Sequence, residues 1–115
     1  MAVVLLSGDL ATQSRVQGVA TRLGKPFHGA FGEARVVELC GSGDVTEVAI
    51  DLSMSGLDVA GLVTALKALD RGRPRVVAFG PHVHEDRLAA AQAAGCDVVV
   101  SRGQFFSQMD AILGG

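Results

Sequence analysis

Short runs of apolar residues alternate with stretches of helical periodicity along the chain, and this alternation restricts the possible folds more than any other feature. Four of the runs are mainly aliphatic and rich in β-branched residues, as expected for strands that are covered on both faces. A weaker run between the first two helical stretches predicts a further strand. The five predicted strands span residues 3–6, 27–31, 45–50, 76–79 and 98–100.

Between and after these runs, apolar residues recur at intervals of three or four residues, which places them on one face of a helix. Gly24 and Gly95 directly follow two of the periodic stretches, at the position where glycine commonly ends a helix. We expect the last stretch to form a single helix. The predicted helices cover residues 10–23, 33–40, 62–69, 86–94 and 105–113.

Five strand–helix units joined by short links predict a parallel sheet, because right-handed crossovers place helices on both of its faces. With 115 residues, the chain is long enough for one hydrophobic core but not for two well-filled ones. We therefore expect one α/β domain over residues 1–115, with a doubly wound, flavodoxin-like sheet in the order 2-1-3-4-5. Ligands of such sheets bind at the carboxyl ends of the strands.

The balance of apolar and charged residues excludes several classes of protein. With 49% hydrophobic and 19% charged residues, the chain is too apolar for disorder and too evenly charged for a membrane span. A net charge of −2 without a lysine or arginine cluster argues against nucleic-acid binding. Residues 2–6 are too few for a signal peptide and follow no positive segment. We expect a cytoplasmic protein with Cys40 and Cys96 as buried reduced thiols.

Two aspartates follow neighbouring strands of the predicted sheet. Asp9 comes after the first strand and Asp51 directly after the third, and these strands are adjacent in the order 2-1-3-4-5. Carboxylate oxygens, a backbone carbonyl and water are suitable ligands for Mg²⁺. Aspartate is also a common N-cap, so each residue can instead be explained as the cap of the helix or loop that follows. Position alone leaves both interpretations open.

Three other patterns contain residue types that bind metals or phosphate or act as nucleophiles. His82 and His84 precede acidic residues, but no third ligand has the spacing of a structural zinc site, so solvated loop residues are the simpler interpretation. The glycines in 41–43 lack the spacing and the lysine of a phosphate-binding loop. Ser7 and Ser101 do not lie in the GxSxG pattern of a hydrolase. We do not expect an enzyme, because a sheet alone does not supply an active site.

The sequence around Asp51 resembles the phosphoacceptor loop of the receiver domains of bacterial response regulators. That loop usually reads Asp, two variable residues, Met-Pro and then Asp-Gly, and residues 51–58 read Asp-Leu-Ser-Met-Ser-Gly-Leu-Asp. Ser55 replaces the proline, and Val59 replaces the final glycine. The segment 94–97, Ala-Gly-Cys-Asp, is similar to the Ala-Gly-Ala-Asp before the fifth strand of this family. Together with the order of the elements, the resemblance covers essentially the whole chain.

Carried over to this chain, the resemblance implies a phosphorylation site with an incomplete set of ligands. Asp51 takes the place of the phosphoacceptor, Ser53 offers a backbone carbonyl to the metal, and Asp9 represents the family's acidic pair. One acid of that pair is missing, so we expect Mg²⁺ to bind weakly. Arg102 stands at the position of the family's lysine, and its planar guanidinium is no substitute for a compact ammonium group. Because Gly103 replaces a proline, we expect a trans peptide bond and a different direction for Arg102.

The residues with which receiver domains respond to phosphorylation are also absent. Gly80, or Phe79 if the alignment shifts by one, stands where the family carries a hydroxyl residue, and Val99 stands where it carries a rotating aromatic. The resemblance therefore implies an atypical receiver domain that binds a protein partner, with weak or no phosphorylation. The alternative is a stand-alone phosphoacceptor in a two-component phosphorelay, in which Asp51 accepts phosphate from a histidine kinase.

The partner implied by the resemblance is a histidine kinase or a signalling output protein. By the same resemblance, it would bind at the side of the domain formed by the helices at 86–94 and 105–113. A second copy of the chain is a further candidate partner.

Overall fold

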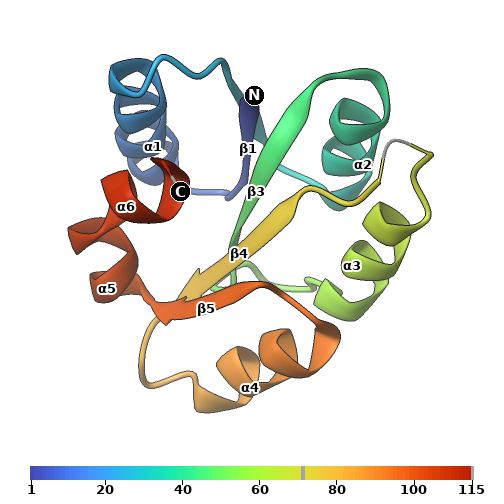
Figure 1. Cartoon of the computed structure of the whole chain (residues 1–115). Helices are drawn as coiled ribbons and strands as arrows, with labels where there is room; N and C mark the ends of the chain where they lie inside the picture. Colours follow the sequence, from blue (N-terminus) through green and yellow to red (C-terminus); the bar gives the residue numbers. More distant parts are fainter. Residues whose placement is uncertain (71, 115) are drawn as a thin grey trace.

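The computed structural model describes residues 1–70 and 72–114 and contains a parallel sheet in the order β2-β1-β3-β4-β5 (Figure 1). The doubly wound sheet and its predicted strand order are therefore confirmed. Within the described residues, no helix has the length and apolar character needed to cross a bilayer. The strands are β1 (Ala2–Leu6), β2 (Phe27–Ala30), β3 (Val45–Asp51), β4 (Arg75–Gly80) and β5 (Val98–Ser101). The helices are α1 (Leu10–Arg22), α2 (Glu33–Ser42), α3 (Val59–Lys67), α4 (Glu85–Ala94), α5 (Arg102–Ser107) and α6 (Met109–Gly114).

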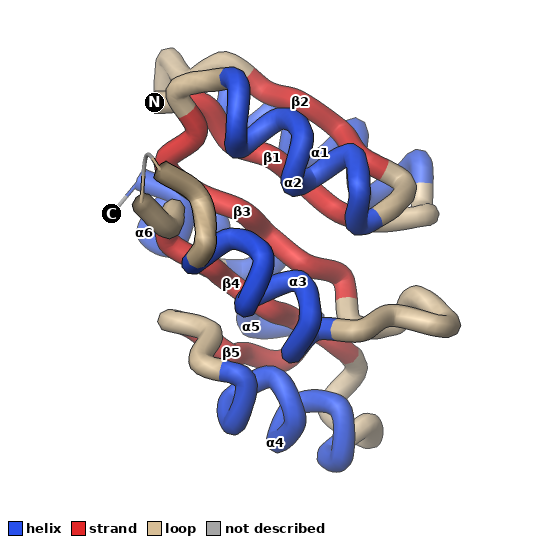
Figure 2. The backbone as a smooth tube through the Cα atoms, turned by 90° about the vertical axis from the view of Figure 1, so that its right-hand side faces the viewer, coloured by secondary structure: helices blue, strands red, loops and turns tan. Residues whose placement is uncertain are grey.

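Alternating residues of the central strands divide between two hydrophobic clusters, one on each face of the sheet. Val3 and Leu5 of β1 belong to one cluster, whereas Val4 and Leu6 belong to the other. This division is expected because successive side chains of a strand point to opposite faces. The first cluster joins the sheet to α1, α5 and α6, and the second joins it to α2, α3 and α4 (Figures 1 and 2). The edge strands β2 and β5 are more exposed than the central ones.

The last predicted helix is divided into α5 and α6, so the prediction of a single helix was wrong. Gln108 separates them with a φ angle of −126°, which lies outside the helical range. α5 begins at Arg102, and the hydroxyl of the preceding Ser101 accepts a hydrogen bond from the Gln104 backbone N–H at 3.1 Å. Both short helices contribute apolar residues to the same core cluster, which explains why their periodicity resembles that of one helix.

Cys40 and Cys96 are buried on the side of the sheet covered by α2, α3 and α4, and neither forms a disulfide. Burial raises the pKa of the Cys40 thiol to about 11 and also raises the pKa of Cys96. Both thiols therefore stay protonated at neutral pH, and a protonated buried thiol is a poor nucleophile. This agrees with the predicted role of the two residues as buried reduced thiols.

Because all five strands run parallel, the loops that follow them meet at one edge of the sheet. β1 and β3 are adjacent, with Leu6 opposite Ile50, and β3 pairs with β4 so that Asp51 lies opposite Phe79. The candidate residues of the predicted site follow these strands or end them. They are Asp9, Asp51, Ser53 and Arg102.

Candidate functional site

Asp51 ends β3 and is only 1% exposed, and both of its carboxylate oxygens accept hydrogen bonds. The Ser7 hydroxyl donates to Oδ2 at 2.7 Å, and the Ser53 hydroxyl donates to Oδ1 at 2.6 Å. The Ser53 backbone N–H also donates to Oδ1, at 3.0 Å. Each oxygen of the buried carboxylate therefore has at least one hydrogen-bond donor from the protein itself.

Ser7 is the side chain after β1 that contacts Asp51, and sequence reasoning missed this role. Ser7 is fully buried, and its hydroxyl also accepts a hydrogen bond from the Asp9 backbone N–H at 3.1 Å. The pairing of Leu6 with Ile50 places the next residue of each strand, Ser7 and Asp51, beside one another. Each directly follows the last apolar residue of its strand, so counting from the two strand ends would have identified the pair.

Asp9 caps the N-terminus of α1, which was one of the two interpretations of its position. Its Oδ1 accepts a hydrogen bond from the Ala11 backbone N–H at 3.3 Å, and its Oδ2 accepts one from the Thr12 hydroxyl at 2.6 Å. The Thr12 hydroxyl is the main cause that holds the pKa of the Asp9 carboxyl below its usual value. Among the described residues, no hydrogen bond joins the Asp9 side chain to Asp51 or Ser53. The two carboxylates are held by separate donors.

Arg102 begins α5, and its side chain contacts α1. Its Nη2 donates to the Thr12 hydroxyl at 3.2 Å and lies 3.5 Å from a carboxylate oxygen of Asp9. The guanidinium also lies over the Phe106 ring, 4.8 Å from the ring centroid. Peptide bonds of the described residues are trans, as predicted for the one before Gly103. The guanidinium therefore pairs with the cap of α1.

Leu52 fills the space beside Gly80 at the end of β4. A Cβ atom placed on Gly80 would lie 3.1 Å from the Leu52 Cβ, closer than an ordinary contact. Leu52 is buried, and its backbone N–H donates to the Phe79 carbonyl at 2.8 Å. The Phe79 ring stacks on Phe105 with 4.0 Å between centroids, in the cluster on the opposite side of the sheet from Leu52. Neither Gly80 nor Phe79 offers a hydroxyl group to Asp51.

The remaining candidates differ in their surroundings. His84 precedes α4 at its N-cap position, with a buried Nδ1 that has no hydrogen-bond partner in the described part of the chain, and His82 is exposed. No group of three or more His, Cys, Asp or Glu residues that could hold a metal ion occurs among residues 1–70 and 72–114. Gly43 ends α2, and Val99 packs partly buried against the cluster under α4.

Mg²⁺ prefers oxygen ligands, and the residues at this edge of the sheet offer several. The Asp51 carboxylate ends β3, the Ser53 backbone carbonyl follows it, and the Ser7 hydroxyl follows the neighbouring β1. Only the carboxylate carries a charge. This donor set fits a weak, largely hydrated magnesium site and does not fit a tight one.

No protein-family model and no curated protein sequence matches this chain, whereas solved receiver domains match nearly all of it. The receiver domain of the sensor histidine kinase PA1611 from Pseudomonas aeruginosa PAO1, solved with magnesium in its active site cleft, has a TM-score of 0.82 at 14% identity, covering 97% of this chain and 93% of that chain. The signal receiver domain of a Bermanella marisrubri response regulator has a TM-score of 0.82 at 16% identity, covering 98% and 95%. A Thermotoga maritima response regulator has a TM-score of 0.79 at 13% identity, covering 98% and 93%. The chain therefore has the receiver-domain fold.

Proposed function

We propose that this chain is an atypical receiver domain in signal transduction, which acts mainly as a protein-interaction module with weak or no phosphorylation. The fold supports the class of function. The observation that carries the finer proposal is the state of Asp51, whose carboxylate is buried and accepts hydrogen bonds from serine hydroxyls on both oxygens. We infer that this carboxylate mainly stabilises the fold and reacts only when its hydrogen bonds are weakened or exchanged.

Transfer of a phosphoryl group to Asp51 requires a carboxylate oxygen that is free for in-line attack. Oδ2 accepts a hydrogen bond from the Ser7 hydroxyl and Oδ1 accepts one from the Ser53 hydroxyl, and such bonds weaken as the oxygen forms a bond to phosphorus. Hydrogen bonds to charged groups are each worth about 1.5–3 kcal/mol, so breaking one adds to the barrier or lowers the population of the reactive form.

The electrostatic support for the transfer is also reduced, because this chemistry depends on positioned cations. Arg102 at the lysine position is engaged with Asp9 and Thr12 and would have to turn toward Asp51. We propose that Mg²⁺ binds weakly through Asp51 and the Ser53 backbone carbonyl, with Asp9 contributing only if it releases the α1 cap. In other active sites, the loss of one preorganised donor slows the reaction by about 10²–10³-fold.

The second candidate function is a stand-alone phosphoacceptor in a phosphorelay, with Asp51 receiving phosphate from a histidine kinase. The position of Asp51 at the end of β3, in a sheet with the receiver-domain order, favours it. In both functions the partner is a protein, either a histidine kinase, a signalling output protein or a second copy of the chain, and the domain itself is not an enzyme. The unpaired buried Cys40 and Cys96 agree with a cytoplasmic location.

Incubation with acetyl phosphate and Mg²⁺, followed by intact-mass measurement, tests the proposal. We expect little or no gain of a phosphoryl group over hours. Asp51→Asn is the control, because any mass gain that remains in this variant comes from another residue. Rapid and stoichiometric phosphorylation that disappears in Asp51→Asn would replace the proposed function by the phosphorelay alternative.

A further inference from the structure

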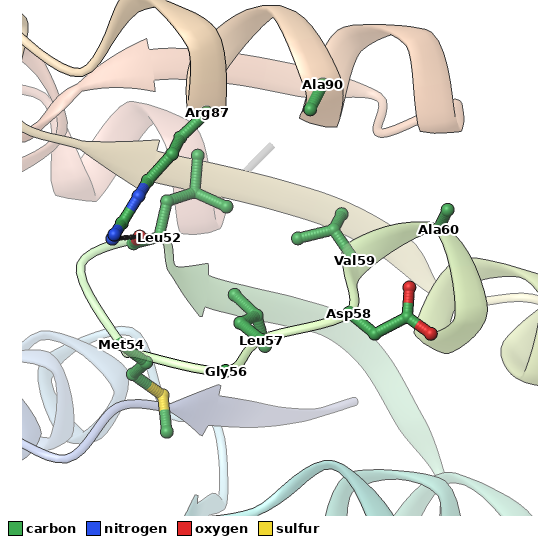
Figure 3. Close-up of a pocket in the computed structure, with 9 residues that line it drawn as sticks. All are labelled: Leu52, Met54, Gly56, Leu57, Asp58, Val59, Ala60, Arg87 and Ala90. Atoms are coloured by element: carbon green, nitrogen blue, oxygen red, sulfur yellow. Dashed lines mark hydrogen bonds between the residues drawn. The ribbon is translucent and has the colours of Figure 1, made fainter.

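A pocket of about 330 Å³ opens between the loop that follows β3 and the first turns of α4 (Figure 3). Its volume lies at the lower end of the range typical of small-molecule sites, which is about 300–1,000 Å³. Apolar side chains form much of its wall, with Leu52 buried at the base and Leu57, Val59 and Ala90 around it. The Asp51 carboxylate does not line the pocket, whereas Arg87 and Ala90 belong to α4, on the side where the resemblance places a protein partner.

The pocket has one cationic end. Arg87 extends from α4 to the backbone of the loop, where its Nη1 donates to the Leu52 carbonyl at 2.8 Å (Figure 3). A guanidinium has five N–H donors, and in the described part of the chain this is the hydrogen bond that Arg87 makes. The remaining N–H donors of the planar Arg87 guanidinium have the geometry that binds a carboxylate with two parallel hydrogen bonds.

The other end of the pocket is acidic. In the view of Figure 3, the Asp58 carboxylate lies beside Ala60, with Leu57 and Val59 between it and Arg87. The Asp58 carboxylate caps α3 by accepting a hydrogen bond from the Gly61 backbone N–H at 3.0 Å. A ligand with one carboxylate is attracted to the Arg87 end, whereas a second carboxylate near Asp58 would be repelled.

We propose that this pocket binds a small aliphatic monocarboxylic acid, with the carboxylate on the Arg87 guanidinium and the aliphatic group against Leu57, Val59 and Ala90. The combination of an apolar wall with a few polar or charged groups is the usual composition of a small-ligand site. The Leu52 carbonyl that Arg87 already binds belongs to the residue directly after Asp51. We therefore expect a ligand bound to Arg87 to change the environment of the Leu52 backbone, next to the candidate phosphoacceptor.

Sodium 4-methylpentanoate is a suitable probe, and its neutral amide is the matched ligand control. Titration followed by amide spectra of the labelled protein should give saturable shifts at Leu57, Val59 and Ala90 and at the amide of Leu52. We expect 4-methylpentanamide to bind about tenfold or more weakly, because it cannot form the charge-assisted pair with Arg87. Equal affinities for the acid and the amide would overturn the proposal.

Two pairs of variants separate the pocket from general effects of charge and size. Arg87→Gln should lose about tenfold or more in affinity, whereas Arg35→Gln, which removes the same charge from the exposed face of α2, should bind as the wild type does. Ala90→Leu should block the pocket, whereas Ala89→Leu, one residue along the same helix, should not. All four positions are exposed, so the variants are expected to fold, and their spectra report whether they do. Undiminished binding to Arg87→Gln, or absence of shifts in the wild type at tens of millimolar acid, would overturn the proposal.

Discussion

Ser7 stands beside Asp51 where a second carboxylate would be needed for the two strands to share a metal ion. Its hydroxyl donates to the Asp51 carboxylate at 2.7 Å. This hydrogen bond offsets part of the free-energy cost of burying the carboxylate and adds no charge. Asp9, two residues further on, is bound by Thr12 and the start of α1. The missing acid is therefore best restored at Ser7. Gly8 is the less direct choice, because it is exposed and a Cβ there has no atom within 4 Å.

We predict that Ser7→Asp binds Mg²⁺ at least about tenfold more tightly than the wild type, because a second charged oxygen joins the same centre. Without metal, the two buried carboxylates repel one another, and we expect a loss of about 1–3 kcal/mol in stability. Calorimetric titration measures the affinity, and thermal unfolding with EDTA or with Mg²⁺ measures the stability. Adding Asp51→Asn should remove the gain. An affinity equal to that of the wild type would show that the magnesium site lies elsewhere.

At the level of the secondary-structure elements, Asp97 connects the start of β5 to the start of β4 by hydrogen bonds. Asp97 ends the Ala-Gly-Cys-Asp segment that resembles the family motif. Its carboxylate accepts hydrogen bonds from both terminal nitrogens of Arg73, at 2.7 and 2.9 Å, and from the Val76 backbone N–H at 2.7 Å. Its own backbone N–H donates to the Val76 carbonyl at 2.9 Å. In this chain, the aspartate of the motif therefore has a structural role.

This arrangement predicts a pH-dependent contribution to stability. The Arg73 hydrogen bonds are the main cause that holds the pKa of Asp97 below its usual value. A carboxyl with a lower pKa in the folded state stabilises the protein above its unfolded pKa, about 3.9, and this stability is lost as pH falls through the folded value. We expect Asp97→Asn to cost about 0.5–1 kcal/mol at neutral pH, since solvent screens a pair exposed by a quarter to a third. Urea unfolding at several pH values should show the difference shrinking in acid; a constant difference would contradict it.

The C-terminal end of α6 is held by cations from two other parts of the chain. Lys25, before β2, forms a 2.5 Å ion pair with Glu47 of β3 and donates to the Leu113 carbonyl at 2.6 Å. Arg75 of β4 donates to the Ile112 carbonyl at 2.5 Å. The Lys25 and Glu47 side chains are only 15% and 8% exposed, so each charge depends on the other.

We predict that Lys25→Met destabilises the domain by about 3–5 kcal/mol, because the buried Glu47 carboxylate loses its partner. The double variant Lys25→Met with Glu47→Leu should regain most of this loss. Arg22→Met is a matched control, since Arg22 also pairs with a residue of α6, Asp110, but both side chains are about 60% exposed; the expected cost is below about 1 kcal/mol. Urea unfolding measures all three. Equal costs for Lys25→Met and Arg22→Met would show that burial of the pair is not what matters.

Over the whole molecule, the sheet could be predicted because its central strands β1, β3 and β4 are largely buried and therefore carry mainly apolar runs. The last helix could not be placed correctly, because the interruption at Gln108 leaves the apolar spacing of α5 and α6 intact. The resemblance directed attention to acidic residues and so to Asp9, while the contact with Asp51 comes from Ser7. Hydroxyl contacts of this kind depend on strand register and side-chain direction, which periodicity does not encode.

Leu52 connects the parts of the molecule that a phosphorylation switch would have to move. Its backbone N–H donates a hydrogen bond to the Phe79 carbonyl of β4, and its carbonyl accepts one from Arg87 of α4. Its side chain occupies the space beside Gly80. Receiver domains respond through a hydroxyl and an aromatic residue, and the resemblance placed these at Gly80 and Val99. By that resemblance, the chain lacks the usual element with two arrangements, and a modification shifts an equilibrium only if it favours one of two arrangements.

We therefore predict that beryllofluoride, which stands in for the acyl phosphate, produces little conformational change in this domain. In the presence of Mg²⁺, any shifts in amide spectra should stay near Asp51 and Ser53, because the buried Leu52 leaves no space for a group to move toward Asp51 from β4. Asp51→Asn, treated in the same way, separates binding at the aspartate from effects of the reagents. Ser7→Asp should increase the local shifts through tighter Mg²⁺ binding but should not extend them to α4, because the groups missing at Gly80 and Val99 are still absent. Large shifts that spread from Asp51 through Leu52 and Arg87 into α4 of the wild type would show that the domain retains a switch.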